Sequence, residues 1–183
     1  MAEDIHEFLE HYGSMVILGH SMGGKAAMVL SIKAPQLVEK LVVADIAPVS
    51  YPHDNTQYVR AMKNVQLDNI VTRGDALMQL AETVPEPELQ NFFAQSLDLK
   101  NKRWKLNLDV LEREMEKIVS FPRLSGQYDK ASLFVSGALS KYVKIKHRPV
   151  IKKLFPKAKF STIENAGHWL HAEKPREFEA VVR

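Results

Sequence analysis

The stretch "VILGHSMGGKAAM" places Ser21 two residues after one glycine and two residues before another, in the pattern glycine-x-serine-x-glycine. A serine hydroxyl is a weak nucleophile near neutral pH unless a histidine accepts its proton and an acid orients that histidine. The chain offers His168 in "ENAGHWLHAEKP" and Asp45 in "VVADIAPV" for these two roles. Together, the three residue types predict nucleophilic attack by serine on a carbonyl carbon.

The residues around Ser21 predict a sharp turn from a buried strand into a helix. The apolar run Met15–Leu18 precedes the turn, and an alanine-rich helix is expected to begin at Met22. This succession is the setting that a nucleophile elbow requires. We expect Gly19 and Gly23 at positions where a side chain would clash with the neighbouring strand and helix. The turn would present the hydroxyl at the positive end of the helix.

The elbow also predicts groups that could bind the substrate oxygen. The backbone amide of Met22 would point at the oxyanion that forms when Ser21 attacks a carbonyl. His20, directly before the serine, is a second candidate for contact with the oxyanion or substrate. His168 follows the last expected strand, and serine, acid, histidine is the chain order typical of such an elbow. His171 has no carboxylate or cysteine at a suitable spacing, so the sequence predicts neither a metal nor a cofactor.

Two aspartates compete for the role of the acid. Asp45 ends a buried strand, from which a carboxylate can reach the histidine. Asp109 lies in "KLNLDVL", where an acid in the first turn of a helix would also complement the helix dipole. Geometry favours Asp45, and both residues are kept as candidates.

Periodicity of the apolar residues predicts the elements that position these groups. Helical spacing indicates a helix over Ala2–Tyr12, and short apolar runs indicate buried strands of a parallel sheet. Further strands are expected at Lys40–Ile46, Ser132–Gly137 and Lys159–Ile163, and further helices at Pro149–Leu154 and from Pro175. Strands that alternate with helices predict an α/β fold with a partial parallel sheet of about four strands.

The middle of the chain shows a different pattern. From about Pro48 to Lys130 only helices and loops are expected. One apolar stripe contains Phe92 and Phe93, and a second contains Leu108 and Met115. Asn107 is expected to cap the second of these helices. We therefore predict a hydrolase-like core at residues 1–47 and 131–183, and a helical lid inserted at residues 48–130.

Composition excludes several classes of function. The 183 residues contain no cysteine, and 25 lysines and arginines stand against 22 aspartates and glutamates, a net charge of +3. These charges are interspersed along the chain, so the sequence does not predict nucleic-acid binding. The absence of cysteine fits an intracellular location. No run approaches 18 apolar residues and the N-terminus is acidic, so we expect neither a signal peptide nor a membrane span.

The motifs resemble the alpha/beta hydrolase superfamily, and within it the small esterases grouped with alpha/beta hydrolase domain-containing protein eleven. The stretches that carry the resemblance are "GHSMGGKAAM", "VVADIAPVSY", "RWKLNLDVL", "GALSKYV" and "LFPKAKFSTIENAGHWLHAEKP". The resemblance implies a serine esterase or lipase acting on lipid esters such as acylglycerols or on short acyl esters, and a mitochondrial location after eukaryotic members. It implies Ser21 as nucleophile, His168 as base and, for many members, an acid at Asp109. Where many relatives carry an aspartate, this chain has Ser140, whose hydroxyl could bind the imidazole.

The resemblance also predicts a difference at the front of the chain. Family members carry about four strands before the elbow strand and take a second oxyanion donor from a loop there. This sequence starts at the helix before the elbow strand, which predicts a truncated form or fragment. Loss of one donor typically costs about 100 to 1,000-fold in turnover. The elbow strand would also become an exposed sheet edge, a site for self-association.

Two other functions compete with ester hydrolysis. A dinucleotide-binding fold would share the order strand, glycine turn, helix, strand and Asp45, but Ser21 replaces the middle glycine and would block the pyrophosphate. The stronger alternative is a non-catalytic interaction or regulatory module that uses the exposed edge and the stripe at Phe92 and Phe93.

Overall fold

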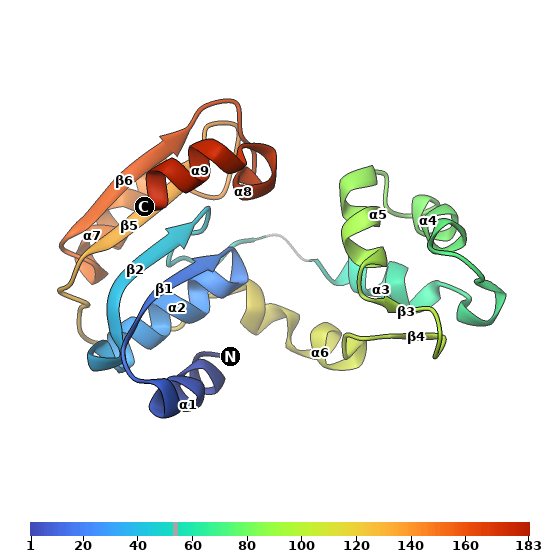
Figure 1. Cartoon of the computed structure of the whole chain (residues 1–183), viewed down its shortest axis with the longest axis horizontal. Coiled ribbons are helices and arrows are strands. Elements are labelled where there is room, and N and C mark those ends of the chain that lie inside the picture. The colour runs from blue at the N-terminus through green and yellow to red at the C-terminus, as the bar shows by residue number, and fades with distance from the viewer. Residues whose placement is uncertain (53–54) are drawn as a thin grey trace. The chain divides into compact units, whose positions relative to one another are not determined.

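The computed structural model describes residues 1–52 and 55–183. The chain forms two compact units, which Figure 1 colours along the sequence. The sheet unit contains Met1–Ser50 and Phe121–Arg183, and the helical unit contains Tyr51–Ser120. The lid was predicted at residues 48–130, and of these, residues 48–50 and 121–130 lie in the sheet unit. Tyr128 is fully buried there, and its hydroxyl donates to the carbonyl of Val38 at 3.2 Å.

The sheet unit is built on parallel strands in the order β1-β2-β5-β6 within the described residues. These strands are β1 (Met15–His20), β2 (Val38–Ala44), β5 (Ser132–Gly137) and β6 (Ala158–Ile163). Each pairs with its neighbour in parallel register. The predicted α/β class with a four-stranded parallel sheet is confirmed.

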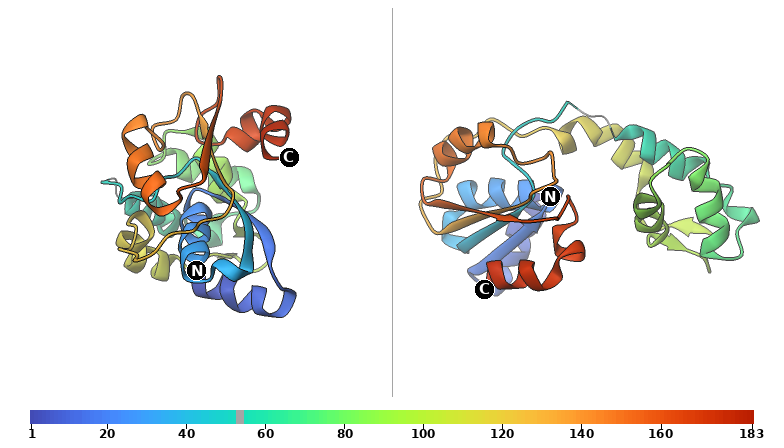
Figure 2. Two further views of the ribbon diagram at one scale, coloured as in Figure 1. Left: turned by 90° about the vertical axis from the view of Figure 1, so that its left-hand side faces the viewer. Right: turned by 90° about the horizontal axis from the view of Figure 1, so that it is seen from above.

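Helices cover the two faces of this sheet. They are α1 (Ala2–Tyr12), α2 (Met22–Lys33), α7 (Arg148–Leu154), α8 (Leu170–Glu173) and α9 (Pro175–Val182), with short 3-10 turns η1 (Pro35–Leu37) and η3 (Ile145–His147). The views show α2 and α9 on opposite faces (Figure 2). Val43 faces α2, where it lies close to Gly24, whereas Val42 belongs to the core cluster under α9 with Phe178 and Val181. Successive side chains of β2 therefore serve different faces, as strand geometry requires.

The β1 strand forms one edge of the sheet and has an open apolar face. Leu18 pairs in register with Val42, so it lies on the same face as the core cluster under α9. Leu18 is nevertheless 47% exposed, and Val16 is 54% exposed. The unpaired backbone of this edge and its apolar side chains offer a template for another strand.

The helical unit packs its helices around a separate core. Its helices are α3 (Thr56–Asn64), α4 (Arg73–Ala81), α5 (Pro87–Ala94) and α6 (Leu108–Val119), with the 3-10 turn η2 (Leu67–Asn69). Asn107 caps α6 as predicted, because its side-chain oxygen accepts the amide of Val110 at 3.1 Å. Leu108 and Met115, two residues of the predicted stripe, are buried in the core of this unit. No helix in residues 1–52 and 55–183 is long and apolar enough to cross a membrane.

The expectation of helices and loops alone in this segment was wrong at one hairpin. Two short strands, β3 (Leu97–Asp98) and β4 (Arg103–Trp104), pair antiparallel. The chain reverses through Lys102, whose φ is 50°, and Asp98 holds the turn by accepting from the side chain of Asn101 at 2.7 Å. Leu97 pairs with Trp104 in this hairpin, and α5 ends before it at Ala94.

Candidate active site

Ser21 occupies a strained turn between β1 and α2. Its φ is 52° and its ψ is −120°, which an L-residue rarely adopts. Its amide donates to the carbonyl of Ala44 at 3.0 Å, and its own carbonyl accepts the amide of Lys25 at 3.1 Å. Such strain costs on the order of 1–3 kcal/mol and persists where the surroundings fix the backbone. Here the neighbouring strand and the first turn of α2 hold the serine at the carboxyl end of the sheet.

The glycines that are crowded at the turn are Gly19 and Gly24, whereas the motif predicted Gly19 and Gly23. A Cβ atom on Gly19 would lie 2.4 Å from the carbonyl oxygen of Gly23, and one on Gly24 would lie 2.6 Å from Cγ2 of Ile46. A Cβ atom on Gly23 would meet no other atom within 4 Å. The steric requirement expected for Gly19 and Gly23 therefore applies to Gly19 but was wrong for Gly23.

These contacts predict opposite outcomes for two alanine substitutions. Gly19→Ala is expected to lower the free energy of unfolding by about 3 kcal/mol or to prevent folding, because the clash is with backbone. Gly23→Ala is expected to leave stability unchanged or raise it by up to about 1 kcal/mol, because alanine is the better helix former. Urea unfolding of both variants measures the difference. Equal stabilities would contradict the crowding.

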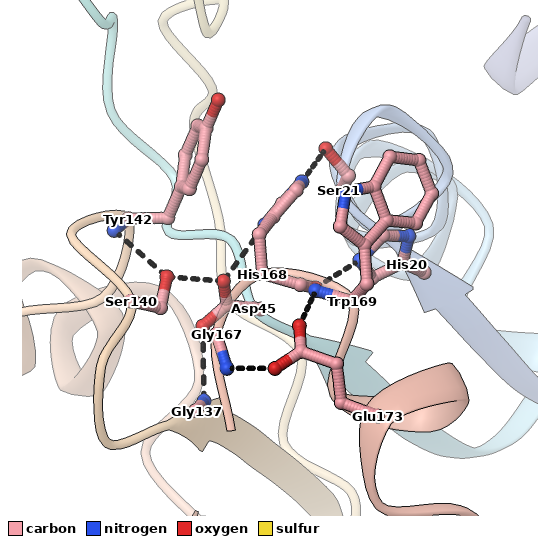
Figure 3. Close-up of polar contacts among 10 residues, drawn as sticks. All are labelled: His20, Ser21, Asp45, Gly137, Ser140, Tyr142, Gly167, His168, Trp169 and Glu173. Carbon is pink, nitrogen blue, oxygen red and sulfur yellow. Dashed lines mark hydrogen bonds and ion pairs between the residues drawn. The ribbon is translucent and has the colours of Figure 1, made fainter. Parts of the chain in front are cut away.

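The imidazole of His168 lies between Ser21 and Asp45 (Figure 3). Its Nε2 atom is 3.0 Å from the Ser21 hydroxyl oxygen, and its Nδ1 atom is 2.7 Å from Oδ2 of Asp45. With the proton on Nδ1, the ring donates to the carboxylate and can accept from the serine. Ser21, His168 and Asp45, which the sequence analysis selected by residue type, are thus joined by hydrogen bonds in the sheet unit.

Asp45 is fully buried directly after β2. Its amide donates to the carbonyl of Val135 at 2.8 Å, and its Oδ1 accepts the amide of Gly137 at 3.2 Å. The hydroxyl of Ser140 donates to Oδ2, the oxygen that also contacts His168. A buried carboxylate is tolerated when its oxygens are hydrogen-bonded in this way. Ser140 therefore contacts the acid, where the sequence had suggested contact with the imidazole.

Asp109 lies in the helical unit and has a different environment. It occupies the first turn of α6, and its side chain is 82% exposed. Its carboxylate lies 2.7 Å from Nζ of Lys63, and this hydrogen bond is the main reason that the pKa of Lys63 is raised. Of the two candidate acids, Asp45 is the one with a hydrogen bond to His168.

Aromatic rings surround the imidazole of His168. The ring of Tyr142 stacks on it with centroids 4.1 Å apart and planes 28° apart, and the ring of His20 lies 4.7 Å away. His20 was a candidate for the oxyanion or substrate, but its Nε2 atom lies 2.8 Å from the carbonyl oxygen of His168. Met22 begins α2 directly after Ser21, so its amide lies at the positive end of that helix.

Burial lowers the pKa of His20 below its ordinary value of 6.5, although the hydrogen bond to His168 opposes that shift. The unfolded chain therefore takes up a proton at this residue before the folded chain does. The contribution of His20 to the free energy of unfolding should be complete above pH 6.5 and should decrease as the pH drops below that value. His20→Gln keeps a donor and does not titrate, so its stability should fall less over the same range. Urea unfolding at a series of pH values tests this, and an equal fall in both proteins would contradict it.

The parallel sheet carries a serine at a strand-to-helix turn, and a histidine links this serine by hydrogen bonds to a buried aspartate. The protein is therefore an α/β protein with a serine–histidine–aspartate site. The chain belongs to the alpha/beta hydrolase family, whose sequence profile matches residues 1–181.

Individual relatives support the same placement. The mouse protein named sn-1-specific diacylglycerol lipase ABHD11 is 38% identical over 192 residues, an alignment that covers 100% of this chain and 62% of the mouse protein. Esterase YbfF of Escherichia coli K12 is 34% identical and is covered over 71% of its length by the whole of this chain. A solved structure described as a marine microorganism esterase superposes with a TM-score of 0.90 at 36% identity, covering 97% of this chain and 72% of that one. The resemblance predicted from the motifs is confirmed, and the chain spans about three fifths of the length of the mouse relative.

Three residues near His168 were not predicted to have their observed contacts. Ser140 binds Asp45, Tyr142 stacks on the imidazole, and the carboxylate of Glu173 accepts the amides of Gly167 and Trp169.

Proposed function

We propose that this chain is a serine hydrolase that cleaves carboxylic esters through an acyl-enzyme on Ser21. The observation that carries the proposal is the position of His168, 3.0 Å from the serine hydroxyl and 2.7 Å from a buried carboxylate. A histidine held this way can take the proton of the hydroxyl while the aspartate stabilises the imidazolium that forms.

The reaction would proceed in two steps. Oγ of Ser21 attacks the ester carbonyl, its proton moves to Nε2 of His168, and the oxyanion is stabilised by the amide of Met22. The imidazolium then gives its proton to the departing alcohol, which leaves an acyl group on the serine. Water, deprotonated by the same imidazole, releases the carboxylic acid and restores the hydroxyl. If the Met22 amide is the sole oxyanion donor, turnover should be lower by about 100 to 1,000-fold than with two donors.

The proposed substrates are small esters, with acylglycerols as one class and short acyl esters as the other. The name of the mouse relative specifies diacylglycerol, whereas that of the bacterial relative specifies only an esterase. An intracellular location is likewise proposed, and the resemblance to eukaryotic members makes it mitochondrial; fractionation of source cells tests both.

A fluorophosphonate probe and a series of 4-nitrophenyl esters test the proposal on the 183-residue chain. The probe reacts covalently with an activated serine, so we expect one probe per chain, located on the peptide that contains Ser21. Ester hydrolysis measured as a function of acyl length then separates the two substrate classes. Folded protein that neither reacts with the probe nor releases 4-nitrophenol would contradict the proposal.

A second candidate function is a non-catalytic interaction module. The observation that favours it is the open edge of the sheet, where Val16 and Leu18 are about half exposed on an edge strand that pairs on one side with β2. Self-association through this edge would cover both side chains. A folded chain that does not react with the probe, and that elutes as a dimer until Leu18 is replaced by lysine, would support this function over ester hydrolysis.

A further inference from the structure

The peptide group that joins His168 to Trp169 is held at both ends by side chains outside the proposed triad. Its carbonyl oxygen lies 2.8 Å from Nε2 of His20, and its N–H donates to Oε1 of Glu173 at 3.1 Å. A peptide group is planar, so fixing its oxygen and its nitrogen fixes the orientation of the whole plane. The Cα atom of His168 is one of the six atoms in that plane.

Glu173 also holds the residue on the other side of His168. Its Oε2 accepts the amide of Gly167 at 2.7 Å, so one carboxylate receives the N–H groups on both sides of the histidine (Figure 3). A Cβ atom on Gly167 would lie 3.1 Å from Oε1, so glycine leaves room for this contact. The amide of Glu173 itself donates to the carbonyl of Trp169 at 2.9 Å, which closes a compact turn.

We propose that Glu173 and His20 are positioning residues that hold the backbone of His168 so that its imidazole stays within reach of both Ser21 and Asp45. This inference rests on the proposed function, because it assigns roles within the same site.

The geometry explains why this support matters. The loop that carries His168 follows β6 and passes through Asn165, whose φ of 55° is uncommon for a residue other than glycine. The imidazole must keep a contact at each nitrogen, 3.0 Å on one side and 2.7 Å on the other. A shift of about 1 Å in a reacting group can cost about 100-fold in rate. His20 is the last residue of β1 and directly precedes Ser21, so its bond to the His168 carbonyl links the turn that carries the serine to the loop that carries the histidine.

The test compares Glu173→Ala and Glu173→Gln with Glu177→Ala, a matched control at an exposed glutamate in α9. Removing the carboxylate should lower kcat and the rate of fluorophosphonate labelling about 10 to 100-fold with KM within about twofold, because the imidazole of His168 shifts relative to Ser21 while no group proposed to bind the substrate is removed. Glutamine keeps one carbonyl oxygen and can accept from one amide fully, so its loss should be intermediate. The control should match the unaltered chain.

A second measurement does not depend on activity. We expect the proton in the hydrogen bond between His168 and Asp45 to give a low-field NMR resonance, which Glu173→Ala should shift or broaden and Glu177→Ala should leave in place. The pair His20→Ala and His20→Gln should behave in the same way, with glutamine retaining more activity because it keeps a donor for the carbonyl.

The outcomes separate this inference from the proposed function. If the unaltered chain is not labelled at Ser21, the proposed function fails, and the NMR comparison still decides the positioning role. If Glu173→Ala labels at the unaltered rate and keeps the resonance in place, the positioning role is overturned. Glu173→Ala could instead lose activity only because less of the protein is folded. If its folded fraction is labelled at the unaltered rate, the positioning role is also overturned.

Discussion

Ser21→Ala should abolish ester hydrolysis and labelling by the fluorophosphonate probe. Loss of the nucleophile in a serine–histidine–aspartate site typically lowers kcat by about 10⁶-fold, because the three groups act as one unit. The substitution removes one oxygen atom from a site where the hydroxyl contacts His168, so the fold should persist. Steady-state hydrolysis of 4-nitrophenyl esters and mass spectrometry of the labelled protein measure both effects.

Ser14→Ala is the matched control, because Ser14 is an exposed serine before β1 whose hydroxyl donates to Glu39. Its turnover and its labelling should equal those of the unaltered chain. Residual turnover in Ser21→Ala within tenfold of the starting value would show that another group performs the chemistry. The acyl-enzyme mechanism would then be wrong for this chain.

Asp45→Asn should lower kcat by about 10⁴-fold, whereas Asp109→Asn should change it by less than about twofold. An asparagine amide facing Nδ1 of His168 favours the opposite tautomer, which leaves Nε2 protonated and unable to accept from Ser21. Asp109 forms an exposed ion pair with Lys63, and exposed ion pairs contribute little to stability.

The two variants need a test of folding beside the kinetics. Asparagine can still accept the amide of Gly137, so Asp45→Asn should retain its thermal unfolding transition, shifted by a few degrees. If Asp109→Asn loses turnover as strongly as Asp45→Asn does, the helical unit supplies the acid, and the preference for Asp45 is wrong.

The proposed nucleophile and the proposed base could be selected from the sequence because both lie in local patterns. A glycine-x-serine-x-glycine turn between an apolar strand and a helix identifies Ser21, and the position of His168 after the last strand identifies its partner. The strands were predictable for the same reason, since buried parallel strands appear as short apolar runs. The predicted span Ser132–Gly137 matches β5 at both ends.

The remaining contacts depend on which strands become neighbours. The choice between Asp45 and Asp109 was left open because it requires β2 beside β5 and β5 beside β6, a sheet order that no local pattern reveals. The bond from Ser140 to Asp45 spans 95 positions of sequence for the same reason. The bridge from Glu173 to two backbone amides was missed because nearly every residue has a backbone N–H, so the amino-acid sequence does not indicate which amides a carboxylate will bind.

Two members of the proposed triad, Ser21 and Asp45, have positive φ values of 52° and 51°. Glycine adopts such angles without the steric penalty that serine and aspartate incur. A laboratory evolution campaign that selects this chain only for heat resistance should therefore favour glycine at position 21, and that gain in melting temperature would remove the proposed nucleophile. Position 45 differs, because glycine there would remove a buried carboxylate that accepts hydrogen bonds from Gly137 and Ser140. Selection for thermostability must be coupled to selection for turnover, because in this molecule a stabilising substitution and the most damaging one fall on the same codon.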